Sequence, residues 1–173
     1  MSAYGARLGE ERISRIVAYL RSVKREAPPA AGDAARGEAI FRGKGGCAGC
    51  HAVGKHGSRL GPDLSKIGRQ RSAAYLRESL LNPDADIVPG FIGVTVITSD
   101  GRTLRGIERS IDEFTVVLQD FSGKVHSFDR ARLKSAARDS GSLMPAYGTT
   151  LTAGELDDVL KYLSMLGIAE VAP

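Results

Sequence analysis

Both cysteines of this 173-residue chain stand in the segment GGCAGCHAVG, residues 45–54, and a histidine directly follows the second. The spacing of three residues places Cys47 and Cys50 about one helical turn apart, so both sulfur atoms can point to the same side. His51 is carried by the same turn. Two thiols and an imidazole this close together are typical of redox pairs, metal sites and covalent cofactor attachment.

Two of these chemistries account for only part of the segment. A structural disulfide or a redox pair of the thioredoxin kind needs a strand leading into the cysteines, and the flanking letters GKGG and HAVG have no strand pattern. A tetrahedral zinc site usually takes four ligands from two separated pairs. The chain has no second cysteine pair, and its only other histidines are His56 and His126. Both interpretations stay open but are disfavoured.

Covalent attachment of haem uses all three residues. Cys47 and Cys50 can form thioethers with the two vinyl groups along one haem edge. His51 then lies under the ring, where an imidazole nitrogen can bind the iron as the proximal ligand. The motif therefore favours haem c, held by both cysteines and ligated by His51.

With this motif the chain resembles the class I cytochrome c family. More narrowly, it resembles the haem-binding c-type cytochrome domain found near the C-terminus of large multidomain exported proteins. The resemblance covers residues 30–168 and rests on four segments: GDAARGEAIFRGKGGCAGCH, RLGPDLSKIG, SLMPAYG and LTAGELDDVLKYLSML. It implies one haem c, transport of one electron at a time between redox partners rather than catalysis, and a periplasmic or otherwise exported location.

The resemblance assigns two further residues of the site. Pro62 matches the proline whose carbonyl accepts a hydrogen bond from the ring N–H of the proximal histidine, which fixes the orientation of that ring. Met144, in the loop SGSLMPAYG, matches the sixth iron ligand on the opposite face. The other candidates for this position are sulfur and imidazole side chains elsewhere: Met1, Met165, His56 and His126.

Two functions from other classes stay open. A haem enzyme or gas sensor would leave the sixth iron position open, with Met144 away from the iron. An interaction module would use haem only structurally and carry its function elsewhere. No general base, nucleophile pair or phosphate-binding loop is recognisable in the sequence, so a substrate pocket has no support.

A net charge of +4 is too modest to indicate nucleic-acid binding. Arg59, Arg69 and Arg71 follow the haem motif and are candidates for contacts with haem propionates or the haem edge, although we favour a solvent-facing role. No run of 18 apolar residues could span a membrane. Charged residues within the first 24 exclude a signal peptide there, so the implied export predicts that the signal lies outside this chain.

Several local signals predict the elements that position these residues. Apolar residues at helical spacing predict a helix over 10–24. Helices after N-cap residues are expected at three places: 33–42 after Asp33, AAYLRESLL after Ser72, and 153–166 after a capping box of Thr152 and Glu155. The resemblance further implies a close crossing of the first and last helices of the cytochrome domain at Gly37, Phe41 and Tyr162.

Residues 91–133 alternate in polarity and are rich in Val, Thr, Ile and Phe, which predicts three to five short antiparallel strands. Asp100-Gly101 and Ser122-Gly123 are expected to be their turns. The predicted fold class is therefore mainly α: a cytochrome c fold of three to five helices around one haem, with an inserted small antiparallel β-sheet (α+β overall). The sheet is expected either to cover the haem edge or to dock a partner.

Residues 1–23 align without gaps on 144–166, with seven of 23 positions identical. This half repeat predicts three parts: 1–27 as the remnant of a preceding cytochrome-type domain with the start of a linker, 28–90 with 134–168 as the cytochrome c domain, and 91–133 as an inserted β-subdomain. Five apolar residues on one face of 10–24 need cover, so this helix is expected to pack on its own domain or in a homodimer. The expected electron partner is a redox protein or a fused dehydrogenase-like domain.

Overall fold

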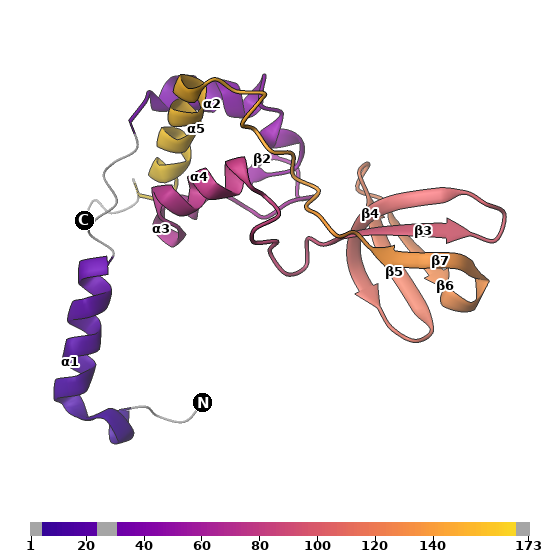
Figure 1. Ribbon diagram of the computed structural model, residues 1–173, viewed down its shortest axis with the longest axis horizontal. Coiled ribbons are helices and arrows are strands. Elements are labelled where there is room, and N and C mark those ends of the chain that lie inside the picture. Colours follow the sequence, from indigo (N-terminus) through magenta and orange to yellow (C-terminus); the bar gives the residue numbers. More distant parts are fainter. Residues whose placement is uncertain (1–4, 24–30, 169–173) are drawn as a thin grey trace.

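The computed structural model describes the backbone of residues 5–23 and 31–168, and the side chains of 9–19 and 31–168 (Figure 1). A group of helices contains α2 (Ala34–Arg42), α3 (Ile67–Gln70), α4 (Ala73–Leu81) and α5 (Ala153–Met165). A β-sheet occupies the chain between α4 and α5, and α1 (Gly5–Val23) precedes both. The helices from the cytochrome-like segments thus form one group, and the strands of the β-rich segment form another (Figure 1).

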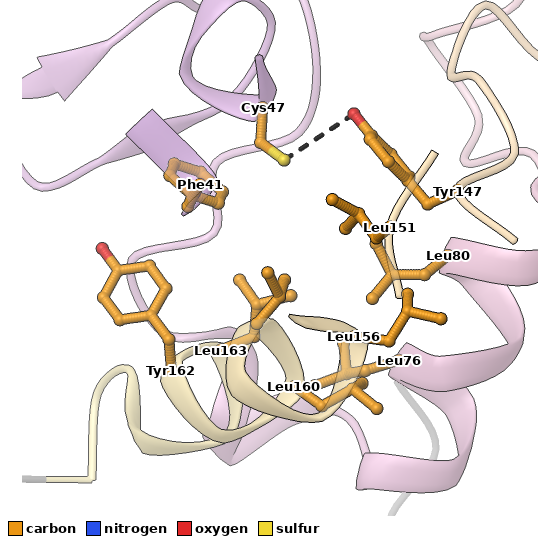
Figure 2. Packing of buried hydrophobic residues seen from close by; sticks show 11 residues of the cluster. Phe41, Cys47, Leu76, Leu80, Tyr147, Leu151, Leu156, Leu160, Tyr162 and Leu163 are labelled. Carbon is orange, nitrogen blue, oxygen red and sulfur yellow. Dashed lines mark hydrogen bonds between the residues drawn. The ribbon is translucent and has the colours of Figure 1, made fainter. Parts of the chain in front are cut away.

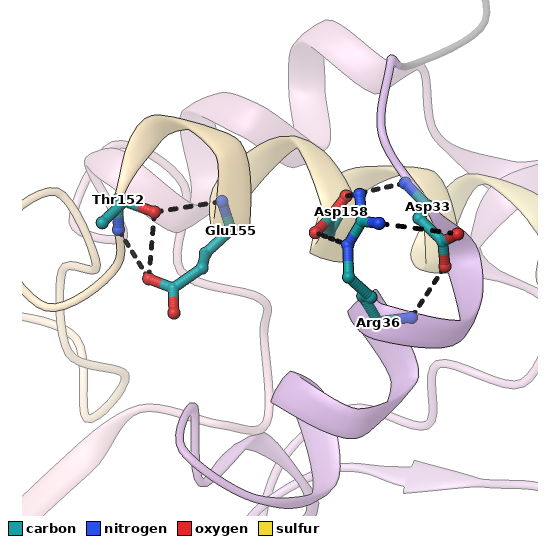
Figure 3. A network of polar contacts seen from close by, with 5 residues as sticks. All are labelled: Asp33, Arg36, Thr152, Glu155 and Asp158. Carbon is teal, nitrogen blue, oxygen red and sulfur yellow. Dashed lines mark hydrogen bonds and ion pairs between the residues drawn. The ribbon is translucent and has the colours of Figure 1, made fainter.

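The three N-cap predictions are confirmed. The Asp33 side chain accepts the Arg36 N–H at 2.9 Å, and the Ser72 hydroxyl accepts the Tyr75 N–H at 3.2 Å. At the start of α5, Thr152 and Glu155 exchange side-chain and backbone hydrogen bonds in a complete capping box (Figure 3). Each cap satisfies backbone N–H groups that have no partner within the helix, and so these helices begin where the sequence predicts.

The helices α2 and α5 cross at close range. A Cβ atom at Gly37 would lie 2.0 Å from the backbone oxygen of Asp158, so only glycine permits this approach. The rings of Phe41 and Tyr162 pack one turn further along, with centroids 5.5 Å apart. This is the crossing that the resemblance implied, and it forms one wall of the core that also contains Cys47.

Asp158 fixes the angle of this crossing from inside α5. Its residue is 6% exposed, and its carboxylate accepts the backbone N–H of Asp33 at 2.7 Å and the Nε–H of Arg36 at 2.8 Å (Figure 3). The hydrogen bond from Arg36, followed by the bond from the Asp33 backbone, lowers the pKa of Asp158. The start of α2 is therefore tied to the middle of α5 by a charged acceptor.

This contact predicts a pH-dependent stability. Because the pKa of Asp158 is lower in the folded chain than its ordinary value of 3.8, the carboxylate stabilises the fold above that value. The contribution is lost as the pH falls from the ordinary value through the folded one. We expect Asp158→Asn to be less stable than wild type at pH 7, and the difference to shrink at pH 3. Denaturant midpoints at both pH values measure this.

Asp157→Asn is the matched control, since Asp157 is the preceding residue and forms an exposed ion pair with Arg77. Exposed pairs contribute little to stability, so this variant should remain close to wild type at both pH values. A stability loss for Asp158→Asn that is the same at pH 3 and pH 7 would contradict the argument.

The sheet consists of β3 (Gly93–Thr98), β4 (Thr103–Ile111), β5 (Thr115–Asp120), β6 (Val125–Asp129) and β7 (Leu133–Arg138). Every neighbouring pair is antiparallel, and the order is β6-β5-β4-β3-β7. Gly101 and Gly123, with φ of 88° and 89°, occupy the two predicted turns. Four side chains that are fully buried form a separate core here: Val94, Val96, Val116 and Leu118.

The prediction of a mainly α fold is wrong. The described residues contain five α-helices, this five-stranded sheet and a two-stranded sheet of β1 (Ala52–Val53) and β2 (His56–Gly57). The sheet has a hydrophobic core of its own, so it is a second structural unit beside the helices. Its last strand, β7, extends to Arg138, beyond the predicted end of the β-rich segment at 133. This strand has no clear alternation in the sequence, because only Leu133 and Ala136 pack on the core of the sheet.

In α1 the helix is interrupted at Gly9, where φ is 69°. Ile13, Ile16 and Val17 lie beyond this break and are 36%, 46% and 37% exposed, respectively. The side chains of the other two members of the predicted stripe, Leu20 and Val23, lie outside the described residues. Among the described residues this part of the stripe is thus only partly covered, and its packing in a homodimer stays a prediction. No helix of the described residues has the length and apolarity to span a membrane.

Candidate functional site

The two cysteines lie on a short 3₁₀ turn that follows α2. This turn, η1, covers Cys47–Gly49, and Gly46 before it has φ of 63°, a conformation that favours glycine. The carbonyl of Cys47 accepts the N–H of Cys50 at 3.1 Å and that of His51 at 2.8 Å. One turn of chain thus holds both thiols and the imidazole, as their spacing predicted.

Cys47 points into the core whereas Cys50 is exposed, and both are free thiols. The Cys47 Sγ atom lies 3.7 Å from the Tyr147 hydroxyl and 3.6 Å from the Gly45 carbonyl oxygen (Figure 2). Burial raises the pKa of the Cys47 thiol. Redox-active dithiols depend on a lowered thiol pKa, so the environment of Cys47 disfavours the thioredoxin-like interpretation.

His51 is oriented by the loop that follows it. Its Nδ1 atom lies 2.8 Å from the carbonyl oxygen of Pro62, which is the contact that the resemblance implied. Because a carbonyl only accepts hydrogen bonds, this contact places the proton on Nδ1 and leaves the lone pair on Nε2. Burial lowers the pKa of His51, although the Pro62 carbonyl acts in the opposite direction. The imidazole is therefore neutral near pH 7 and presents Nε2 as a donor atom for a metal.

Two glycines that the sequence analysis missed make room for this histidine. A Cβ atom at Gly61 would lie 2.9 Å from both Cε1 and Nδ1 of the His51 ring. At Gly57, φ is 94° and a Cβ atom would lie 2.2 Å from the His51 carbonyl oxygen. Gly61 also donates its N–H to the Cys50 carbonyl at 2.6 Å. The position of Gly61 directly before Pro62 was the available sequence signal.

We therefore expect Gly61→Ala to displace the His51 ring. The new methyl group would meet the ring at a distance that normal contacts do not allow, and overpacking of this kind costs about 1–3 kcal/mol in stability. In haem-loaded protein the proximal bond should weaken, and the ferric spectrum should gain a component that lacks histidine ligation. Absorption spectra and thermal unfolding measure the two effects. Gly154→Ala, where a Cβ atom meets nothing within 4 Å, is the control and should leave the spectrum unchanged.

Met144 lies on the loop between β7 and α5 and is half-buried against the cluster that contains Cys47. Its N–H donates to the Ser142 hydroxyl at 3.1 Å, and the Ser142 N–H donates to the Asp84 carboxylate at 2.6 Å. The fold thus brings the methionine loop to the same core as the haem motif, although the two are far apart in sequence. Ligation of iron by Met144 stays a prediction.

The other candidates for the sixth ligand lie in different surroundings. Met165 ends α5 and is 51% exposed. His56 is exposed on β2. His126 belongs to the sheet, where its Nε2 atom lies 2.7 Å from the Asp120 carboxylate. Met1 lies outside the described residues.

The three candidate arginines are all exposed. Arg71 lies over the ring of Tyr75, with its guanidinium carbon 4.9 Å from the ring centroid. Arg69 is on α3, and Arg59 lines a small groove between the haem-motif loop and the turn after β5. Contacts with haem propionates stay a prediction for each of them.

The site's surroundings fit haem c. Apolar side chains from α2, α4, α5 and the methionine loop form one buried cluster with Cys47, most of which Figure 2 labels: Phe41, Leu76, Leu80, Leu151, Leu156, Val159, Leu160, Tyr162 and Leu163. Tyr147, which the sequence analysis missed, belongs to the same cluster. Two free thiols and an imidazole with its lone pair on Nε2 are the groups that would attach haem c and ligate its iron. By contrast, the described residues contain no group of three His, Cys, Asp or Glu side chains that could hold a metal ion such as zinc.

Comparison with known families agrees with this chemistry. The family model for Cytochrome c matches residues 34–98. The match begins with α2, includes the haem motif, α3 and α4, and ends at the last residue of β3. Met144 and α5 lie beyond it. No curated protein matches the chain.

Proposed function

We propose, from the premise that this chain contains a class I c-type cytochrome domain, that it binds one haem c and carries one electron at a time between redox partners. Haem binding and electron transfer are the functions of the family. The finer assignment is that Cys47 and Cys50 attach the haem and that His51 is its proximal ligand. When bound, the haem iron takes up and releases a single electron.

The hydrogen bond between His51 and Pro62 is the observation that carries this proposal. It supports a role for Nε2 as the metal donor, because Nδ1 is already occupied by the carbonyl. The ring cannot rotate freely, since Gly61 lies against it. A histidine held in this way would present Nε2 to the iron in the same orientation before and after the electron is transferred. A fixed orientation of the His51 ring favours rapid electron transfer, because few atoms of the site have to move when the iron changes its oxidation state.

Met144 is the proposed sixth ligand. Its loop lies against the same core as Cys47, and a thioether on the second axial position raises the reduction potential relative to two nitrogen ligands. A site with both axial positions filled carries electrons without binding a substrate. This favours electron transfer over a haem enzyme or gas sensor, whose iron needs an open position.

The wider organisation is also part of the proposal. Residues 28–90 and 134–168 would form the cytochrome c domain, 91–133 an inserted β-subdomain whose sheet continues through β7 to Arg138, and 1–27 the remnant of a preceding cytochrome-type domain with the start of a linker. The intact protein would be exported and matured in the periplasm or an equivalent compartment. Its electron partner would be a separate redox protein or a fused dehydrogenase-like domain. The exposed stripe of α1 supports association with another domain or a second copy.

Maturation of the full chain in a host that attaches haem c tests the proposal. We expect one haem per chain, reversible one-electron reduction and a ferric spectrum with a methionine–iron charge-transfer band. A high-spin ferric spectrum with immediate cyanide binding would favour the haem enzyme or gas sensor. Haem that is bound but cannot exchange electrons with small redox mediators would contradict the electron-transfer function.

A further inference from the structure

Tyr147 connects the methionine loop with the haem motif. It lies three residues after Met144, and only 6% of its surface is exposed. Its hydroxyl donates a hydrogen bond to the Gly45 carbonyl oxygen at 2.8 Å, and the Cys47 thiol approaches the same hydroxyl at 3.7 Å (Figure 2). A single side chain therefore joins segments that are about a hundred residues apart.

The backbone of Tyr147 is held as firmly as its side chain. Its N–H donates to the Leu80 carbonyl at the end of α4, at 2.8 Å. Its own carbonyl accepts the N–H groups of Thr150 and Leu151 at 3.1 and 3.0 Å, which starts the turn leading to α5. Tyr147 is thus anchored to α4 by the backbone and to the haem motif by its hydroxyl.

On the N-terminal side of Met144 the loop is held at Ser142, whose N–H donates to the Asp84 carboxylate at 2.6 Å, whereas on the C-terminal side its neighbours are exposed. Pro145, Ala146 and Gly148 are exposed, and Met144 is half-buried. In the segment from Met144 to Gly148, Tyr147 is the one buried residue. The segment that follows Met144 is therefore held in the core through the Tyr147 ring.

The bond to Gly45 does not depend on a free thiol at Cys47. The tyrosine O–H is the donor to Gly45, whereas the S–H group is the donor toward tyrosine. A thioether at Cys47 would remove only the second of these contacts. The acceptor is also well fixed, since Gly45 is buried and a Cβ atom there would lie 2.9 Å from the Ile40 carbonyl and 3.1 Å from the Cys47 Sγ atom.

We propose that Tyr147 is a positioning residue for the sixth iron ligand: its hydrogen bond to Gly45 holds the methionine loop against the Cys47 side of the site and keeps Met144 within reach of the iron. This inference rests on the proposed function, in which Met144 is that ligand. Tyr147 acts through the loop and makes no bond to the metal itself.

Tyr147→Phe in the full haem-loaded chain tests the inference. Phenylalanine keeps the buried ring and the backbone contacts but removes the hydroxyl, leaving the Gly45 carbonyl without its donor. Because a hydrogen bond of this kind contributes modestly to an equilibrium, cyanide should bind the ferric protein about two- to tenfold faster. The methionine–iron band should also disappear at a lower temperature than in wild type.

Tyr162→Phe is the matched control. Tyr162 is 8% exposed in the same core, on α5 and outside the methionine loop. Its variant loses a hydroxyl from an equally buried ring, and should leave the cyanide rate and the band unchanged. If Tyr147→Phe and Tyr162→Phe alter both readouts equally, the effect is general loosening of the core and the inference is overturned.

A double variant separates this inference from the proposed function. In a Met144→Ala background, Tyr147→Phe should not accelerate cyanide binding further, because there is no ligand left to position. An equal acceleration in both backgrounds would overturn the inference. If the wild type itself lacks the methionine–iron band, the assignment of Met144 fails first, and the role of Tyr147 falls with it. If the band is present and Tyr147→Phe matches wild type, only the inference fails.

Discussion

Haem should stay with the polypeptide through acid–acetone extraction of the matured wild-type chain, and should pass into the solvent when both Cys47 and Cys50 are replaced by alanine. The two thioethers are the only covalent links that the sequence offers, since the chain has no other cysteine. We expect loss of attachment to be complete in the double variant, and each single variant to retain one thioether. Haem absorbance in the protein and solvent fractions measures this.

His126→Ala is a suitable control for the extraction, because His126 pairs with Asp120 in the sheet and lies outside the haem motif. It should retain all of its haem. Extraction of haem from the wild-type chain itself, or purified protein that contains zinc in place of haem, would refute covalent attachment at Cys47 and Cys50.

Met144→Ala should open the sixth position of the iron while leaving His51 and both thioethers in place. The reduction potential should fall by an amount on the order of 100 mV, because a thioether ligand stabilises the reduced iron. Cyanide and carbon monoxide should bind at least about tenfold faster, because no ligand has to leave the iron first. A tenfold change corresponds to about 1.4 kcal/mol in the equilibrium between the closed and the open sixth position. Potentiometric titration and stopped-flow mixing measure the two effects.

Met165→Ala is the control for this variant, since Met165 is half exposed at the end of α5. Its potential and its cyanide rate should match those of wild type. An unaltered spectrum in Met144→Ala would assign the sixth ligand elsewhere, and the next variants to test would replace Met1, His56 and His126.

Local signals predicted a large part of this molecule correctly. Asp33, Ser72 and Thr152 cap helices because each side chain bonds N–H groups only a few residues away. The turn that carries Cys47 and His51 depends on a spacing that can be read directly. The turns at Gly101 and Gly123 follow from the conformations that glycine permits. All of these features are determined by short stretches of chain.

The features that sequence analysis missed depend on contacts between distant segments. Asp158 has a conspicuous role only because α2 and α5 cross. Gly61 matters because the His51 ring lies against it, and Tyr147 because its hydroxyl reaches Gly45. The mainly α prediction failed for a similar reason. It rested on local helix signals. The sheet forms a separate unit because β7 pairs with β3, which lies far from it in sequence, and together they complete a second core.

The pairing of β3 with β7 has a consequence for the order in which the chain folds. These are the first and last strands of the sheet, and the Asp139 N–H donates to the Gly93 carbonyl at 2.8 Å, so the chain leaves the sheet beside the point where it entered (Figure 1). Closure of a flexible loop costs entropy that grows with the logarithm of its length. A folded sheet removes about half of the residues between His51 and Met144 from the flexible connection, which lowers that entropic cost by roughly 0.6 kcal/mol. Completion of the sheet before the methionine loop docks is then the faster route to a core that contains both segments.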